Sequence, residues 1–174
     1  MIWINENCDI LSESEKKLLK NKCNNFIVTD MPIFIEQTRR KNYYNRNFLD
    51  IKDNKIKKIL DKITNEVKSI FKINTIYSSG IWINKIDSKS NKNDGFHRDS
   101  AEFTFLLYLN ENFEGGEFEY IDEKDTKIKI KPKNNMCIIS KKELLHRVLP
   151  VISGERFSLV TFFKTYKKDK ITLI

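Results

Sequence analysis

The sequence predicts a mainly β protein of the α+β class, in which N-terminal helices pack on an antiparallel double sheet. Two observations lead to this prediction. The N-terminal half contains apolar residues spaced three and four positions apart, the period of a helix with one buried face. From about residue 76 onward the period changes to two, and no helical segment separates the short strands, which excludes a parallel βαβ sheet.

Two helices are expected before residue 75. Ser12 and Glu15 form a capping box, in which each side chain bonds a free amide of the first turn, so a short helix is predicted to about Cys23. A longer helix is predicted from Asp53 to about Lys72. Its buried face would consist of the apolar residues Ile56, Ile59, Leu60, Ile63, Val67, Ile70 and Phe71.

The rest of the chain is interpreted as strands and turns. Residues 25–50 are read as a strand, a turn at Pro32 and a polar loop from Arg39 to Asn47. The C-terminal strands are expected at Ser79–Lys85, Phe96–Asp99, Phe103–Asn110, Gly116–Ile121, Lys127–Lys131, Met136–Ser140, Leu144–His146 and Arg156–Lys164.

A chain of 174 residues with 40% hydrophobic and 11% aromatic residues is long enough and apolar enough for one folded domain. We therefore expect a single domain over 1–174, with a helical support region at 1–75, a β core at 76–166 and a basic tail at 167–174. Neither a membrane-spanning segment nor a signal peptide is evident, and three cysteines without CxxC spacing (Cys8, Cys23, Cys137) suit a reducing compartment. The expected location is cytoplasmic or otherwise intracellular.

The net charge of +8 raises nucleic acid as a partner, because a basic patch collects phosphates. The excess is mostly lysine, however, since only six of the 32 basic residues are arginine. Together with abundant Ile and Asn, this composition is typical of an AT-rich coding sequence, which places Lys on solvated surfaces whatever the function. Nucleic acid is therefore not the favoured partner, and the oligomeric state is left open.

The chain contains two histidines, and both lie in the predicted β half. His97 and Asp99 form an H-x-D motif that would place both side chains on one face of a strand. His146 follows far enough downstream to reach the same place from a facing strand. Two imidazoles and a carboxylate are the facial triad of non-haem Fe(II) oxygenases. An isolated H-x-D is weak evidence, because most such residues lie on surfaces or in satisfied cores.

Arg156 and Ser158 open the last predicted strand and share one of its faces. A guanidinium and a hydroxyl placed in this way can converge on one carboxylate, with the guanidinium making two parallel charge-assisted bonds. The alternative for Arg156 is a surface ion pair, which contributes little stability. Its spacing from His146 favours the carboxylate-binding role.

From Gly95 to Lys164 the chain resembles the catalytic core of the 2-oxoglutarate and Fe(II)-dependent dioxygenases, and within them the prolyl 4-hydroxylase-like branch. The matching pieces, in order, are Phe96-His97-Arg98-Asp99, the strand Phe105 to Asn110, the turn Phe113 to Phe118, and His146 to Val151 with Gly154, Arg156 and Ser158. The resemblance implies a double-stranded β-helix, a jelly-roll or cupin-like sandwich, with the N-terminal helices on its major sheet.

The resemblance also implies roles for particular residues. His97, Asp99 and His146 would bind Fe(II), and Arg156 would pair with the distal carboxylate of 2-oxoglutarate. Tyr108 matches a Tyr that donates to the same carboxylate in some members, although a plain core aromatic remains an alternative. Ser158 is a second donor. Dioxygen would be the co-reactant and ascorbate the reductant, with succinate and carbon dioxide as products of a hydroxylation.

The resemblance leaves the substrate open. A peptide or protein side chain such as proline is favoured, and a nucleobase or a small metabolite are alternatives, as is a non-catalytic metal-binding interaction domain on the same fold. Relatives that repair alkylated nucleic acid carry a second Arg after the 2-oxoglutarate Arg, and this chain has none there. The strand around Trp82 lacks a Tyr found in many relatives. Residues without an assigned role are Trp82, Arg39, Arg40, Tyr43, Tyr44 and the loop 87–94.

Overall fold

The computed structural model describes residues 1–24, 45–89 and 95–166. Several sequence predictions therefore lie outside the described residues. They are the strand and Pro32 turn expected after residue 25, most of the polar loop with Arg39, Arg40, Tyr43 and Tyr44, the second half of the 87–94 loop, and the basic tail at 167–174.

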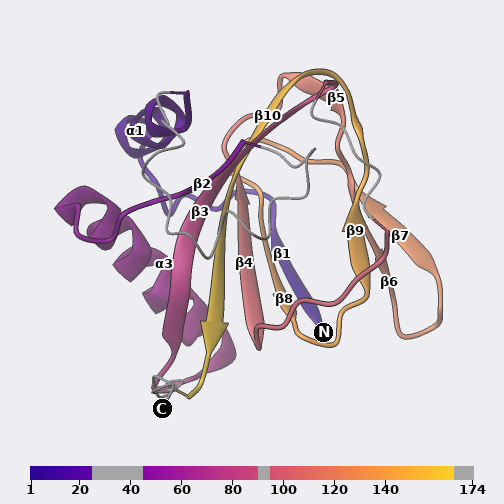
Figure 1. Ribbon diagram of the computed structural model, residues 1–174. Helices are drawn as coiled ribbons and strands as arrows, with labels where there is room; N and C mark the ends of the chain where they lie inside the picture. Colours follow the sequence, from indigo (N-terminus) through magenta and orange to yellow (C-terminus); the bar gives the residue numbers. More distant parts are fainter. Residues whose placement is uncertain (25–44, 90–94, 167–174) are drawn as a thin grey trace, which may run out of the picture.

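Two antiparallel sheets face each other in the described part of the chain, and together they form a double-stranded β-helix (Figure 1). The major sheet has the strand order β1-β8-β4-β10-β3-β2, with β5 paired to β10 off this path. The minor sheet has the order β7-β6-β9. The strands of the major sheet are β1 (Ile2–Asn5), β2 (Asn45–Phe48), β3 (Tyr77–Asp87), β4 (Phe103–Tyr108), β5 (Phe113–Gly115), β8 (Cys137–Lys141) and β10 (Val151–Lys164). Those of the minor sheet are β6 (Phe118–Ile121), β7 (Lys127–Ile130) and β9 (His146–Val148).

Both predicted helices form close to their expected bounds, as α1 (Glu13–Asn24) and α3 (Asn54–Phe71). The capping box is present, since the amide of Ser12 donates to Glu15 Oε2 at 2.8 Å and the amide of Glu15 donates to Ser12 Oγ at 3.3 Å. Asp53 caps α3 by accepting from the amide of Lys55 at 2.9 Å. Among the described helices, none joins the length to the apolar character that crossing a bilayer requires.

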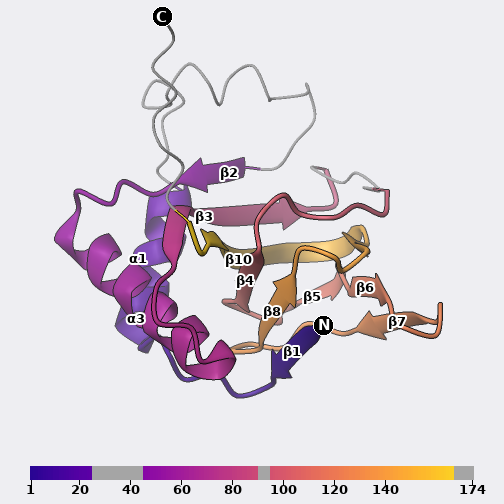
Figure 2. The same ribbon diagram turned by 90° about the horizontal axis from the view of Figure 1, so that it is seen from below.

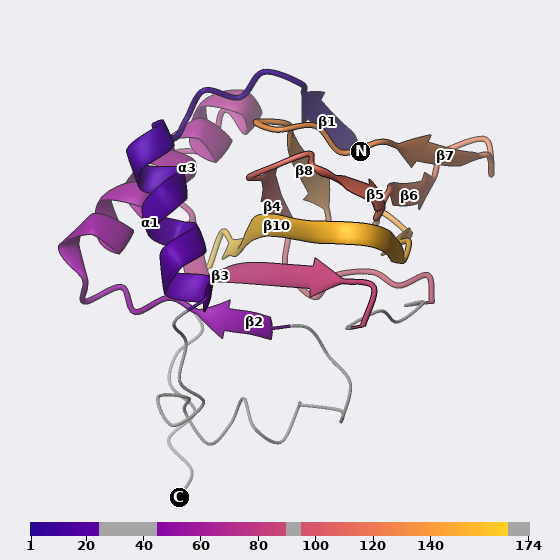
Figure 3. The same ribbon diagram turned by 90° about the horizontal axis from the view of Figure 1, so that it is seen from above.

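The helices lie on the face of the major sheet that is turned away from the minor sheet (Figures 2 and 3). The predicted apolar face of α3 is the face that packs there, and its fully buried members are Ile56, Ile59, Ile63 and Val67. These side chains share one core with the outward-facing residues of β3, β4 and β10, such as Ile83, Phe105 and Leu159. Burial of each large aliphatic side chain stabilises the fold by about 1.5–3 kcal/mol. The opposite face of the major sheet is thereby left to line the space between the sheets.

Two sequence predictions about local structure need correction. Residues Phe96–Asp99 do not form a regular strand, because within the described chain this segment has only one isolated bridge, between His97 and His146. The sequence also predicts no strand at residues 2–5, whereas β1 lies at one edge of the major sheet and β2 at the other. Part of the expected loop up to Asn47 belongs to β2. Both edge strands are four residues long, too short to show a period in the sequence.

Two glycines allow β5 to lie close against the bent start of β10. Gly154 has a φ of +78°, and a Cβ at this position would lie 2.6 Å from the carbonyl oxygen of Asn112. Gly115 has a φ of +75° and packs against the carbonyl of Pro150. A side chain is strained at positive φ and would collide with these carbonyl oxygens. The glycines therefore set the path by which β10 reaches Arg156.

The packing of α3 on the sheet leads to a stability prediction. Ile63→Ala should lower the free energy of unfolding by roughly 2–5 kcal/mol, because the fully buried side chain would leave a cavity between α3 and the sheet. Lys58→Ala, at an exposed position of the same helix, should change it by no more than about 0.5 kcal/mol. Urea unfolding of both variants measures the difference, and equal stabilities would show that α3 does not pack as described.

Candidate functional site

His97 and His146 form a directly hydrogen-bonded antiparallel pair. The amide of His97 donates to the carbonyl of His146 at 2.9 Å, and the amide of His146 donates to the carbonyl of His97 at 3.0 Å. Opposed residues in such a pair carry their side chains on the same face. The two imidazoles therefore lie together in the space between the sheets, with ring centroids 4.6 Å apart.

In each imidazole ring, a hydrogen bond to the carbonyl two residues earlier determines which nitrogen carries the proton. His97 Nδ1 lies 3.1 Å from the carbonyl oxygen of Gly95, and His146 Nδ1 lies 3.0 Å from that of Leu144. A carbonyl oxygen only accepts hydrogen bonds, so each Nδ1 must carry the proton. In a neutral imidazole this leaves the lone pair on Nε2, the arrangement required of a metal ligand.

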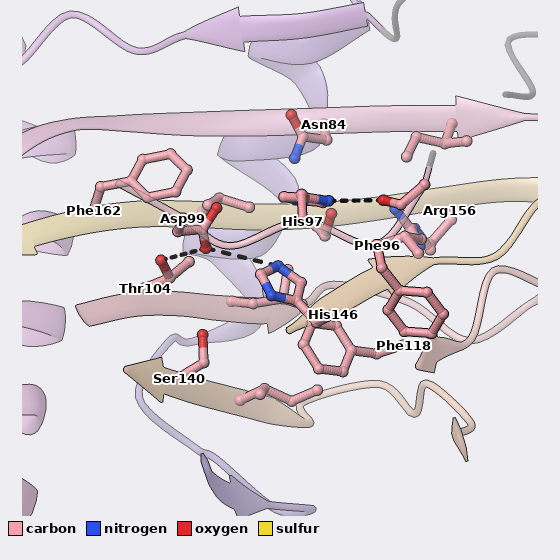
Figure 4. Close-up of a pocket in the computed structure, with 17 residues that line it drawn as sticks. Asn84, Phe96, His97, Asp99, Thr104, Phe118, Ser140, His146, Arg156 and Phe162 are labelled. Carbon is pink, nitrogen blue, oxygen red and sulfur yellow. Dashed lines mark hydrogen bonds and ion pairs between the residues drawn. The ribbon is translucent and has the colours of Figure 1, made fainter. Parts of the chain in front are cut away.

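Asp99 completes a cluster with the two histidines (Figure 4). One ligand atom from each of the three side chains can be chosen so that all lie within 4.8 Å of one another. Asp99 Oδ2 is 3.7 Å from His146 Nε2 and accepts a hydrogen bond of 2.6 Å from Thr104 Oγ1. Two imidazole nitrogens and a carboxylate, all oriented by neighbouring groups, are a donor set that suits Fe(II).

The three side chains differ in exposure. His146 is buried, Asp99 is partly buried and His97 is exposed. The ring of Phe118 stacks on His146 with centroids 5.1 Å apart and an angle of 17° between the planes. Burial lowers the pKa of His146, although the Leu144 carbonyl and Asp99 act in the opposite direction. The lowered pKa favours the neutral form, which is the form that binds a metal.

The cluster opens into a cavity of about 500 Å³ between the two sheets. This volume lies within the range of roughly 300–1,000 Å³ that is usual for small-molecule sites. Besides the cluster, the cavity is lined by aromatic and aliphatic side chains and by a few polar ones. They include Asn84, Phe96, Leu106, Phe118, Ile138, Ser140, Val148, Arg156, Ser158, Val160 and Phe162.

Arg156 lies in the cavity wall on β10 and is only 3% exposed. Its Nη1 donates to the carbonyl oxygen of Gly116 at 2.9 Å, and its guanidinium carbon lies 5.9 Å from the centre of the Tyr108 ring. The start of β10 is held by Asn110, which donates to the carbonyl of Glu155 at 2.7 Å and accepts from the amide of Phe157 at 2.8 Å. These contacts place a cation at a fixed point of the cavity.

A row of three polar side chains crosses the inner face of the major sheet beside Arg156. Ser158 of β10 stands opposite Asn84 on β3 and opposite Tyr108 on β4. Three buried atoms of this row, Asn84 Oδ1, Ser158 Oγ and Tyr108 Oη, have no hydrogen-bond partner among the described residues. Leaving buried polar atoms unbonded costs free energy, so such atoms are typical of a site that a ligand completes.

Tyr108 remains a hydrogen-bond donor over the physiological range. Burial raises the pKa of Tyr108 to about 12, while the Arg156 guanidinium acts in the opposite direction. The phenol is fully buried, and Tyr108 shares the inner face of β4 with Leu106. The structure thus places Tyr108 next to Arg156, on the side facing the minor sheet.

The structure brings together all six residues that the sequence singled out. His97, Asp99 and His146 form the cluster, and Tyr108 and Ser158 belong to the polar row beside Arg156. Among the residues that contact or line the site and that sequence reasoning missed are Asn84, Thr104, Phe118 and Ser140. Trp82 lies on the same face of β3 as Asn84, opposite Val160, and contacts Phe162 edge to face with ring centroids 5.2 Å apart. In the part of the 87–94 loop that is described, Asp87 Oδ1 accepts from the amide of Lys89.

Comparison with known families agrees with this site. Residues 84–164 match the model of the 2OG-Fe(II) oxygenase superfamily. A PKHD-type hydroxylase of Hyphomonas neptunium (strain ATCC 15444) is 38% identical over 78 residues, which are 45% of this chain and 34% of that protein. The chain thus spans about a third of the length of this curated relative. On these findings the part of the chain that carries the cluster and Arg156 is similar to the 2OG-Fe(II) oxygenase superfamily.

Solved structures of prolyl hydroxylases have a similar fold. A prolyl-4-hydroxylase of Pseudomonas putida superposes with a TM-score of 0.69 at 16% identity, over 94% of this chain and 92% of that chain. A prolyl hydroxylase of Trichoplax adhaerens, in complex with a hypoxia inducible factor oxygen degradation domain peptide fragment, has a TM-score of 0.69 at 14% identity, over 94% and 83%. The predicted resemblance and the double-stranded β-helix are confirmed.

The contact between Thr104 and Asp99 makes a prediction about metal affinity. Thr104→Val keeps the shape of the side chain but removes the donor to Asp99 Oδ2, so we expect affinity for Co(II) to fall about 10-fold. Thr104→Ser keeps the hydroxyl and should stay close to the wild type. Titration followed by the visible absorption of Co(II) measures both. Equal affinity of the Val and Ser variants would contradict a role for this hydrogen bond.

Proposed function

We propose that this chain is a 2-oxoglutarate- and Fe(II)-dependent dioxygenase that hydroxylates a C–H bond, most plainly that of a prolyl side chain in a polypeptide. The observation that carries this proposal is the pairing of His97 with His146, since it presents two Nε2 lone pairs beside Asp99. In this proposal these three side chains hold the iron. The three side chains border the cavity, so a metal held by them would be accessible from it.

The polar row suits 2-oxoglutarate as the second ligand. At neutral pH a dicarboxylate offers only hydrogen-bond acceptors. Arg156, Tyr108 and Ser158 offer a guanidinium and two hydroxyl donors, and the two hydroxyl oxygens have no other partner among the described residues. A carboxylate at this place would satisfy the buried donors and would itself be paired with a cation. We assign the distal carboxylate of 2-oxoglutarate to this place.

When both are bound, iron and 2-oxoglutarate supply oxidative decarboxylation by dioxygen, which yields succinate and carbon dioxide and leaves one oxygen atom for the substrate. The protein's own residues bind and orient. His97, His146 and Asp99 fix the metal, Arg156 and Tyr108 fix the far end of the cosubstrate, and the aliphatic walls exclude water. Ascorbate is proposed as the reductant that restores Fe(II).

Two findings support a prolyl peptide as the substrate class. The fold is similar to that of prolyl hydroxylases, and one of these was solved with a peptide fragment. Beyond the polar row, the cavity wall is apolar, with Phe96, Phe118 and Phe162 among its residues. A ring such as that of proline brings no charge and no side-chain hydrogen-bonding group, so it suits an apolar wall.

The decisive experiment is turnover by the purified protein with Fe(II), 2-oxoglutarate, ascorbate and a proline-rich peptide. We expect succinate release together with a +16 Da peptide product in mass spectrometry. His97→Ala and Asp99→Ala should abolish both signals while the protein stays folded, because each removes a proposed iron ligand. Full turnover in either variant would refute the iron site. Succinate coupled to oxidation of a nucleobase or small metabolite would retain the oxygenase and overturn the prolyl substrate.

The assignment of Arg156 is tested separately. Arg156→Ala should raise the 2-oxoglutarate KM roughly 10- to 100-fold, because a hydrogen bond to a charged group is worth about 1.5–3 kcal/mol. Lys85→Ala removes a cation from the neighbouring strand, on the face that carries Phe157, and should leave this KM unchanged. An unchanged KM in the Arg156 variant would remove this residue from the cosubstrate site.

A further inference from the structure

The segment that carries two of the proposed iron ligands is weakly held by its backbone. In the described chain, residues 95–99 pair with β9 through the single bridge at His97. The N-terminal neighbour, Gly95, is exposed and has nothing within 4 Å of its Cβ position. Side-chain contacts must therefore hold this segment in place, as the backbone hydrogen bonds between paired strands do elsewhere in the sheet.

A row of side chains on the outer face of the minor sheet provides these contacts. Glu119 of β6 stands opposite Arg147 of β9 and Lys129 of β7. Phe96 adjoins this row, because the antiparallel bridge at His97 and His146 sets Phe96 beside Arg147. Glu119, Arg147 and Lys129 lie on the other side of the sheet from the side chains of the two histidines, which face the cavity, whereas Phe96 contacts Arg147 and also lines the cavity.

Glu119 and Arg147 form a tight ion pair. The Nε of Arg147 donates to Glu119 Oε2 at 2.6 Å, and the Glu119 side chain is only 3% exposed. Lys129 is a looser partner, 3.9 Å from Glu119 Oε1 and 61% exposed. A buried carboxylate requires a bonded cation, so Glu119 holds the Arg147 guanidinium in one position.

The guanidinium so held lies against the ring of Phe96. The guanidinium carbon of Arg147 is 4.6 Å from the centre of the ring, which is well within the range of a cation–π contact. The ring belongs to the residue directly before His97. The chain of contacts therefore runs from β6 through β9 to the H-x-D segment without involving any proposed ligand.

We propose that Glu119, Arg147 and Phe96 form a clamp that positions His97 and Asp99, and that this clamp sets the affinity of the site for a divalent metal. The inference rests on the proposed function, because it concerns the same iron site. The three residues are positioning residues, since none of them contacts the metal ligands' donor atoms. Outer contacts of this kind typically change metal affinity about 10- to 100-fold when they are removed.

Mn(II) binding to the metal-free protein, followed by electron paramagnetic resonance, tests the clamp without turnover. Arg147→Met and Phe96→Leu should each weaken Mn(II) binding about 10-fold. The double variant should bind no more than about twofold more weakly than Phe96→Leu, because both changes break the Arg147–Phe96 contact and Phe96→Leu alone also removes the longer contact with Lys127 Nζ, which lies 5.9 Å from the ring centre. Lys129→Met removes a cation from the same row but does not contact Phe96, and should stay within about twofold of the wild type.

The outcomes separate this inference from the proposed function. If the wild type binds no Mn(II), the iron site itself is wrong, and the clamp falls with it. If the wild type binds but Arg147→Met binds equally well, the clamp alone is wrong. Additive losses in the double variant, or an equal loss in Lys129→Met, would also overturn it. Should Arg147→Met fail to unfold cooperatively, Arg147→Lys, which keeps the charge without the planar fork, decides in its place.

Discussion

The two backbone hydrogen bonds between His97 and His146 are the contact on which the site depends. They join a segment without regular strand structure to the edge of the minor sheet, and they bring together two residues that are far apart in sequence. Because the pair is directly hydrogen-bonded, both imidazoles must project to the same side. The bonds from each Nδ1 to a nearby carbonyl then turn both Nε2 lone pairs toward the shared point. Geometry and protonation are thus set by the main chain rather than by the ligand.

The major sheet provides the second half of the site by a different means. Its outer face is covered by α1 and α3, so its inner face can carry polar groups without exposing the core (Figure 1). The row Asn84, Ser158 and Tyr108 places three unbonded polar atoms together beside the one buried guanidinium of the described cavity wall. In an empty protein this arrangement costs stability. In the proposed function, the carboxylate of the cosubstrate would bond these atoms and recover this free energy.

Much of the fold could be predicted because its elements follow simple periods. The buried face of α3 and the capping box of α1 appear in the sequence as spacing and residue type, and both form as expected. The strands β1 and β2 could not be found, since four residues at a sheet edge show no period. The segment Phe96–Asp99 was predicted as a strand from its residue pattern. Such a pattern does not show whether a neighbouring strand is available for continuous backbone hydrogen bonding, and here only one bridge forms.

The candidate site was predictable to the extent that rare residue types mark it. The chain has two histidines, and both are in the cluster. Thr104 and Tyr108 are harder, because β4 is buried on both faces and its sequence Phe103–Tyr108 does not alternate. Only the register with β8 and β10 shows that Thr104, Leu106 and Tyr108 share the inner face. Phe118 is an ordinary strand residue and Asn is abundant throughout this chain, so the sequence carries no signal that Asn84 and Phe118 line a cavity.

A non-catalytic binding domain on the same fold is less consistent with these details than an oxygenase. A structural metal site is closed by protein ligands on all sides. Here the described residues offer three candidate ligands, and the cluster borders a cavity of about 500 Å³ whose wall includes Arg156. A site that served only to stabilise the fold would need neither the cavity nor unbonded hydroxyl groups at its far wall. A small anionic cosubstrate that reaches from the metal to the far wall needs an accessible metal and a buried cation such as Arg156. An interaction surface needs neither.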